Sequence, residues 1–140
     1  MKEIHSYWAY LVVILLVVAV VNAIIGFTQN KKFTDKDLRI GLFTLIVTHI
    51  QLLIGLAWYF MSPWFQALKD NAGEVMGDKA ARLLAVEHPT MMILAIVFIT
   101  IGWSKHKKKT EDKAKFKCFM IFYGLGLLFV LSRIPWSNWF

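Results

Sequence analysis

YWAYLVVILLVVAVVNAIIGFT, residues 7–28, contains no charged side chain. About twenty apolar residues in a row are enough for a helix to cross the hydrocarbon core of a bilayer. A secretory signal peptide has a shorter apolar region, and small residues at a cleavage site close it. Neither property fits this stretch, so we expect a membrane-spanning helix that remains in the mature protein.

Three further apolar stretches follow the first one along the chain. Together the four predict helices over residues 7–28, 40–61, 79–104 and 117–136. Of the 140 residues, 58% are hydrophobic and only 18% are charged, which is too apolar for a small domain that must fold in water. We therefore expect an all-α fold: one membrane domain over residues 1–140, a four-helix transmembrane bundle with up-down-up-down topology. Asp78 is expected to cap the third helix.

The orientation of the bundle follows from its lysines and arginines, which concentrate in cytoplasmic loops of membrane proteins. Eleven of the sixteen basic residues fall in the first and third loops. They are Lys31, Lys32, Lys36, Arg39, Lys105, Lys107, Lys108, Lys109, Lys113, Lys115 and Lys117. We expect a multi-pass protein of the bacterial inner membrane with both termini on the outer, periplasmic side.

Two classes of function do not fit this composition. The net charge of +7 lies mostly in short loops between apolar stretches, which serves orientation, whereas nucleic-acid binding needs a folded basic surface. Cys118 is the single cysteine, so an internal disulfide and a zinc site built on cysteine pairs are excluded.

Histidines are the side chains most able to carry chemistry here. His49 lies deep in the second predicted helix, His88 in the outer half of the third, and His5 just before the first. A polar side chain in hydrocarbon is costly, so a histidine inside a membrane helix suggests a function. His106 stands in the run SKHKKK, where we expect a solvated loop and no functional role.

A pair of histidines on facing helices suits a haem, which takes an axial ligand on each face of its iron. Counted along the helices, His49 lies about 15 Å from the cytoplasmic edge and His88 about 24 Å from it. His49 and His88 are the first choice of axial ligands despite this mismatch, and His5 with His88 is the second. Three histidines cannot supply the four ligands of two haems, so one haem b is expected.

The haem propionates would face the outer interface, where Arg82 or Arg133 can hold them. Other interpretations stay open at this stage. His49 and His88 can serve as structural residues that bond to neighbouring polar groups. Glu87 can exchange protons with a quinone in a haem-free protein, or simply lie at the interface.

Several short motifs resemble those of small four-helix membrane proteins of the cytochrome-b-like kind. They are His5-Ser6, Thr48-His49-Ile50-Gln51-Leu52, Glu87-His88, the stretch FYGLGLL at 122–128, and Ile134-Pro135-Trp136. The resemblance covers nearly the whole chain. It implies b-type haem binding and a redox or respiratory role.

The expected function is therefore electron transfer between the membrane quinone pool and a partner on the outer side. The protein would act as a subunit or relay beside other membrane-protein subunits, and not as a stand-alone enzyme. A haem-free accessory subunit of a larger membrane complex is the alternative, and a haem-processing enzyme is a third class.

Overall fold

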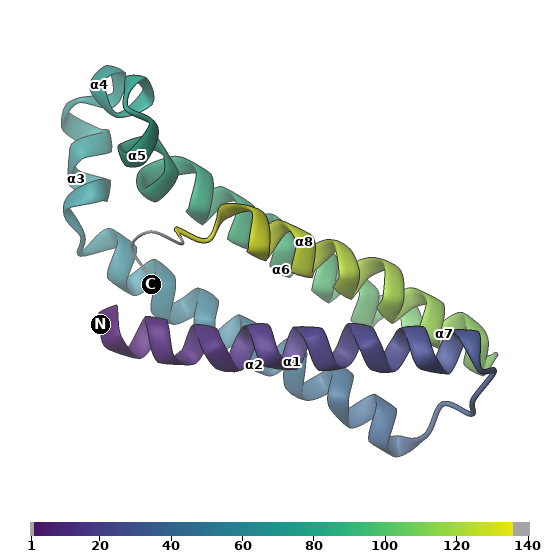
Figure 1. Ribbon diagram of the computed structural model, residues 1–140. Coiled ribbons are helices and arrows are strands. Elements are labelled where there is room, and N and C mark those ends of the chain that lie inside the picture. Colours follow the sequence, from purple (N-terminus) through teal and green to yellow (C-terminus); the bar gives the residue numbers. More distant parts are fainter. Residues whose placement is uncertain (1, 136–140) are drawn as a thin grey trace.

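The computed structural model describes residues 2–135, which form helices and no strand. Four helical stretches are long and apolar enough to cross a membrane: Glu3–Thr28, Asp35–Phe60, Lys79–His106 and Asp112–Arg133. Successive stretches run in opposite directions along a bundle (Figure 1). The predicted all-α, four-helix, up-down-up-down fold of a multi-pass membrane protein is thus confirmed.

The first two spans are single helices, α1 (Lys2–Thr28) and α2 (Asp35–Phe60). Asn30, just after α1, has a φ of 52°, a left-handed conformation that asparagine tolerates better than most residues, and the chain turns there. Asp37 fixes the start of α2, because its carboxylate accepts from the backbone N–H of Thr34 at 2.9 Å and from Asn22 Nδ2 at 2.8 Å.

The third and fourth spans each contain one π-helical turn. The third consists of α5 (Lys79–Arg82), the π turn η1 (Leu83–Glu87) and α6 (His88–His106). The fourth consists of α7 (Asp112–Cys118), the π turn η2 (Phe119–Tyr123) and α8 (Gly124–Arg133). The predicted cap is confirmed, since Asp78 Oδ1 accepts from the backbone N–H of Ala80 at 3.1 Å.

Several predicted boundaries need correction. The first helix begins at Lys2, the second at Asp35 and the fourth at Asp112, because helix formation continues through polar residues beyond the apolar stretch. The fourth helix ends at Arg133: Ile134 is extended, as expected for a residue before proline. The predicted end at Trp136 lies outside the described residues. Between spans two and three, the chain forms two short helices, α3 (Pro63–Asp70) and α4 (Ala72–Gly77).

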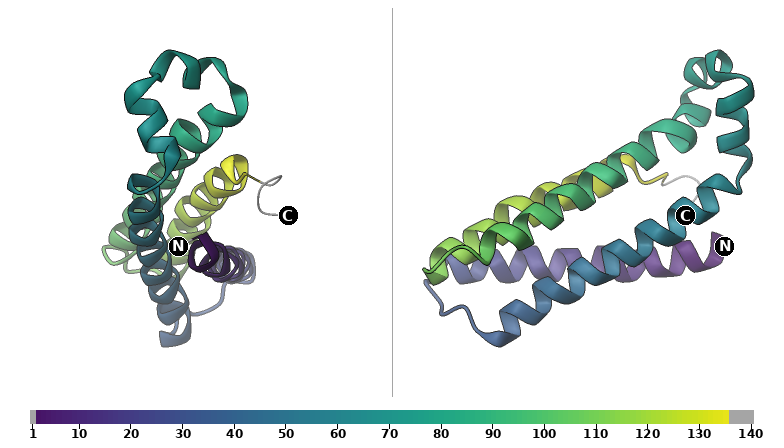
Figure 2. Two further views of the ribbon diagram at one scale, coloured as in Figure 1. Left: turned by 90° about the vertical axis from the view of Figure 1, so that its left-hand side faces the viewer. Right: turned by 180° about the vertical axis from the view of Figure 1, so that it is seen from behind.

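The two ends of the bundle differ in how closely the helices pack. At the end that carries the lysine-rich connection between α6 and α7, here called the lysine end, a Cβ added to Gly41 would lie 2.7 Å from the ring of Phe119. Tyr123 is fully buried there and donates to the carbonyl of Gly41 at 2.8 Å. Toward the opposite end, called the termini end, α6 and α8 diverge from α1 (Figures 1 and 2). The bundle therefore opens at the termini end.

Candidate functional site

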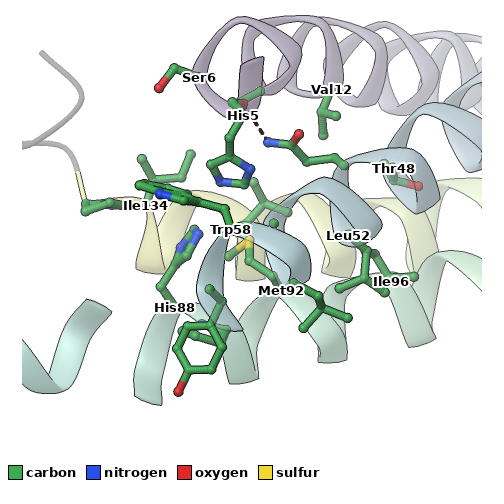
Figure 3. A pocket seen from close by; sticks show the side chains of 18 of the residues that line it. His5, Ser6, Val12, Thr48, Leu52, Trp58, His88, Met92, Ile96 and Ile134 are labelled. Atoms are coloured by element: carbon green, nitrogen blue, oxygen red, sulfur yellow. Dashed lines mark hydrogen bonds between the residues drawn. The ribbon is translucent and has the colours of Figure 1, made fainter. Parts of the chain in front are cut away.

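A cavity of about 340 Å³ lies between the helices on the termini side of the bundle. Its size falls in the range of roughly 300–1,000 Å³ that is usual for small-molecule sites. Side chains of α1, α2, η1, α6 and α8 line it, and most of them are apolar (Figure 3). His5, Gln51 and His88 are the main polar exceptions.

The π turn η1 and Pro89 place His88 on this wall. Pro89 has no N–H, so the carbonyl of Ala85 loses the donor that an α-helix would supply. Tyr59 of α2 replaces that donor: its hydroxyl donates to the Ala85 carbonyl at 2.6 Å. π turns interrupt the regular spacing of side chains around a helix and occur often at functional sites. The π turn η1 is thus tied to α2 beside the cavity.

One ring nitrogen of His88 is already bonded to the protein. Its Nδ1 lies 2.8 Å from the main-chain oxygen of Arg133. A carbonyl only accepts, so Nδ1 carries the hydrogen, and Nε2 has a free lone pair. The carbonyl is available because Arg133 is the last residue of α8, where carbonyls lack helical donors. His88 is therefore fixed in the tautomer that can bind a metal through Nε2.

His5 faces His88 from α1. The two ring centroids lie 6.3 Å apart and the ring planes are nearly perpendicular, at 88° (Figure 3). Trp58 packs against His5 with a centroid separation of 5.3 Å. Gly55 leaves room for the imidazole, since a Cβ there would lie 3.1 Å from His5 Cε1. His5 Nδ1 is buried and has no hydrogen-bond partner within the described part of the chain.

Gln51 links α2 to the backbone of His5. Its Nε2 donates to the main-chain oxygen of His5 at 2.8 Å. The amide oxygen of the same side chain is buried and, like His5 Nδ1, has no partner among residues 2–135. The wall between α1 and α2 thus carries two buried polar atoms without partners in the described part of the chain. From sequence, Gln51 stands only as a member of the motif Thr48-His49-Ile50-Gln51-Leu52, and its contact with His5 was not predicted.

The two arginines predicted to hold propionates both contact Glu87. Arg82 Nε lies 3.3 Å from Glu87 Oε2, and Arg133 Nε lies 4.0 Å from Glu87 Oε1. Each of the three side chains is about a third exposed. Two guanidinium groups share one carboxylate, so this cluster carries one net positive charge next to His88.

His49 lies apart from this pair. Its Nδ1 is 2.7 Å from the carbonyl of Leu45, and its Nε2 is 3.3 Å from Thr100 Oγ1 on α6. It does not line the cavity. The structure therefore brings together the second-choice pair, His5 with His88, and not the first-choice pair, His49 with His88.

His106 does not occupy the solvated loop that its lysine neighbours suggested. It is the last residue of α6 and is only 2% exposed. Its ring packs against Phe33, Trp103 and Phe119, and its Nδ1 lies 2.5 Å from the carbonyl of Trp103. Trp103 lies three residues earlier and therefore on the same helix face. This spacing was the feature of the sequence that could have indicated a helix reaching His106.

Comparisons with protein-family models, with curated proteins and with solved structures found no match to the chain.

Proposed function

We propose that the chain is a b-type membrane cytochrome that holds one haem between His5 and His88. The observation that supports this most is the facing pair of imidazoles, with ring centroids 6.3 Å apart, on an apolar cavity. A histidine nitrogen binds a transition metal at about 2 Å, so two imidazoles on opposite sides of one iron have centroids about 6 Å apart. The observed separation is compatible with that arrangement.

The number of ligands also favours a haem over a protein-only metal site. A structural or catalytic zinc site uses three or four side chains. Among residues 2–135, no group of three His, Cys, Asp or Glu side chains is placed to hold a metal. Two imidazoles match an iron whose other four positions are taken by a porphyrin.

The donor chemistry of the two histidines fits axial ligation. His88 presents a free Nε2 while its Nδ1–H is bonded to a carbonyl, which is the usual arrangement for a metal-binding histidine. His5 has a buried nitrogen that has no hydrogen-bond partner among the described residues. His49 takes no part in this proposal, because both of its ring nitrogens already have neighbours in the protein.

The charged cluster beside His88 supports the same occupant. Arg82 and Arg133 share Glu87 and retain one net positive charge, which favours an anionic group such as a propionate. We assign at least one of these arginines to that contact. Bound haem would supply one-electron redox chemistry.

We further propose that the termini end, where the haem would bind, faces outward, and that the lysine end faces the cytoplasm of a bacterial cell. A single haem at one end of the bundle does not bridge the bilayer. The protein would then act as a subunit or relay between the quinone pool and an outer-side partner.

The spectrum of the purified protein tests the proposal. The protein is expressed with a supply of haem, extracted in detergent, and measured as a reduced-minus-oxidised difference spectrum. The proposal expects a b-type spectrum with one haem per chain. A stable, colourless preparation would support the alternative of a haem-free accessory subunit, and conversion of added haem to a product would indicate a haem-processing enzyme.

A further inference from the structure

Two buried polar atoms on the wall between α1 and α2, His5 Nδ1 and Gln51 Oε1, lack partners within the described residues. A polar atom buried without a partner is costly, and native proteins seldom leave one without a reason. These two belong to residues already in contact, because Gln51 Nε2 donates to the main-chain oxygen of His5. Because the two residues are in contact, a single hydrogen bond between these two atoms would give each of them a partner.

The chemistry of the two atoms is complementary. A main-chain carbonyl only accepts, so the nitrogen of the Gln51 amide must face His5 O, and the free atom is the acceptor oxygen. His5 Nδ1 becomes a donor when the ring binds a metal through Nε2. His88 already has such a donor–acceptor pair, between its Nδ1 and the carbonyl of Arg133. His5 lacks the equivalent bond.

On α2, both Gln51 and Gly55 contact His5. Gln51 and Gly55 are four residues apart, so they lie one above the other on the same face of the helix. Gly55 has no side chain where it meets the Cε1 and Nδ1 edge of the His5 ring. The absence of a side chain at Gly55 thus lets the Nδ1 edge of the ring lie against α2, one helical turn from the Gln51 amide.

We propose that Gln51 is the positioning residue for His5, and that its amide oxygen accepts from Nδ1–H when His5 presents Nε2 to the haem iron. The inference rests on the proposed haem function. A hydrogen bond to the far nitrogen of an axial imidazole makes the ligating nitrogen more electron-rich. It therefore favours oxidised iron and lowers the midpoint potential.

Two substitutions separate this role from a merely structural one. Gln51→Glu keeps an acceptor, and a stronger one, but loses the donor to His5 O. Gln51→Leu loses both. If Gln51 served only to hold the backbone of His5, Gln51→Leu would not raise the potential, and Gln51→Glu would lower it through its added charge alone, without changing the resonance spectrum of the haem. As a positioning residue, Gln51→Glu lowers the midpoint potential and Gln51→Leu raises it.

Thr44→Val is the matched control, because Thr44 is a fully buried polar residue of α2 that does not line the cavity. Its potential should equal that of the wild type. The electron paramagnetic resonance spectrum of the oxidised haem, which responds to the bonding of the axial imidazole, should change in both Gln51 variants and not in the control.

The outcomes distinguish the inference from the function on which it rests. Wild-type protein that binds no haem overturns both. Haem-loaded Gln51 variants whose potentials stay at the wild-type value, or move together, overturn the inference alone. If Gln51→Leu does not fold, Gln51→Glu decides: a lowered potential with a changed resonance spectrum supports the inference, and wild-type values for either overturn it.

Discussion

His88 donates from Nδ1 to the main-chain oxygen of Arg133 across 2.8 Å. This bond joins the first residue of α6 to the last residue of α8 at the open end of the bundle. It fixes the tautomer of a cavity-facing histidine through a carbonyl that the end of a helix leaves available. Arg133 also contacts Glu87, the residue before His88, so the charge cluster around Glu87 lies beside this bond.

Neutralising that cluster should shift the midpoint potential of the bound haem in a predictable direction. Arg82→Gln and Arg133→Gln each remove a positive charge near the iron, so reduction becomes less favourable and the potential falls. Glu87→Gln removes the negative charge that both arginines share, so the potential rises. Redox titration measures all three variants. Lys107→Gln, at the lysine end, is the control and should leave the potential unchanged; wild-type potentials in all three would contradict the assignment.

Tyr59→Phe should destabilise the protein by about 1–3 kcal/mol, the usual cost of leaving a buried carbonyl unpaired. The Tyr59 hydroxyl donates to the Ala85 carbonyl. Pro89, four residues after Ala85, has no N–H that could donate to this carbonyl. Thermal unfolding in detergent measures the change. Tyr7→Phe is the control, since Tyr7 is 73% exposed.

A double-mutant cycle tests the reason for this cost. In a Pro89→Ala background the helix regains a backbone N–H, which can take the place of the Tyr59 hydroxyl. Tyr59→Phe should therefore cost less in that background than in the wild type. An equal cost in both backgrounds would mean that Tyr59 and Pro89 are not coupled.

Gly126→Ala and Gly124→Ala should have opposite effects, although they lie two residues apart on α8. A Cβ at Gly126 would lie 2.7 Å from Ile99 and 3.2 Å from the carbonyl of Ala95, so α6 and α8 must move apart. A Cβ at Gly124 meets nothing within 4 Å. We expect Gly126→Ala to cost about 1–3 kcal/mol in unfolding free energy. Gly124→Ala should be neutral or stabilising by up to about 1 kcal/mol, because alanine favours helix. Similar thermal unfolding of the two would contradict this packing.

The topology prediction concerns which side of the membrane each end of the bundle faces. Reporter domains fused to both termini should be active on the outer side, and a reporter in the connection between α6 and α7 should be active in the cytoplasm. The reason is the eleven basic residues that lie in, or within a few residues of, the two connections at the lysine end. A cytoplasmic C-terminus would contradict the orientation.

Most of the fold could be predicted because apolar length alone decides it. A stretch such as residues 7–28 has no stable place in water, so the number and approximate position of the spans follow from composition. The ends of the spans were harder to place, because a helix can extend beyond its apolar stretch into polar residues. Two of the spans begin in this way, at Asp35 and at Asp112. Arg133 ends its helix by a local rule, the proline two residues later.

The site was only partly predictable. His88 was identified from its depth, but the choice of its partner depends on which way each helix face points. The π turn Leu83–Glu87 changes the direction in which the side chains of the third span point. No pattern in its sequence predicts this turn. His49 is the first choice from sequence because it lies deep in its predicted helix, whereas in the structure it is His5 of α1 whose ring contacts that of His88.

The most direct test of the central claim is the haem content of four purified variants beside the wild type. His5→Ala and His88→Ala each remove one proposed axial ligand, whereas His49→Ala and His106→Ala remove histidines that lie elsewhere. The account predicts one haem per chain in the wild type and in the last two variants, and a sharp loss in the first two. Full haem retention in His5→Ala, or loss in His49→Ala with His5→Ala unaffected, would contradict it.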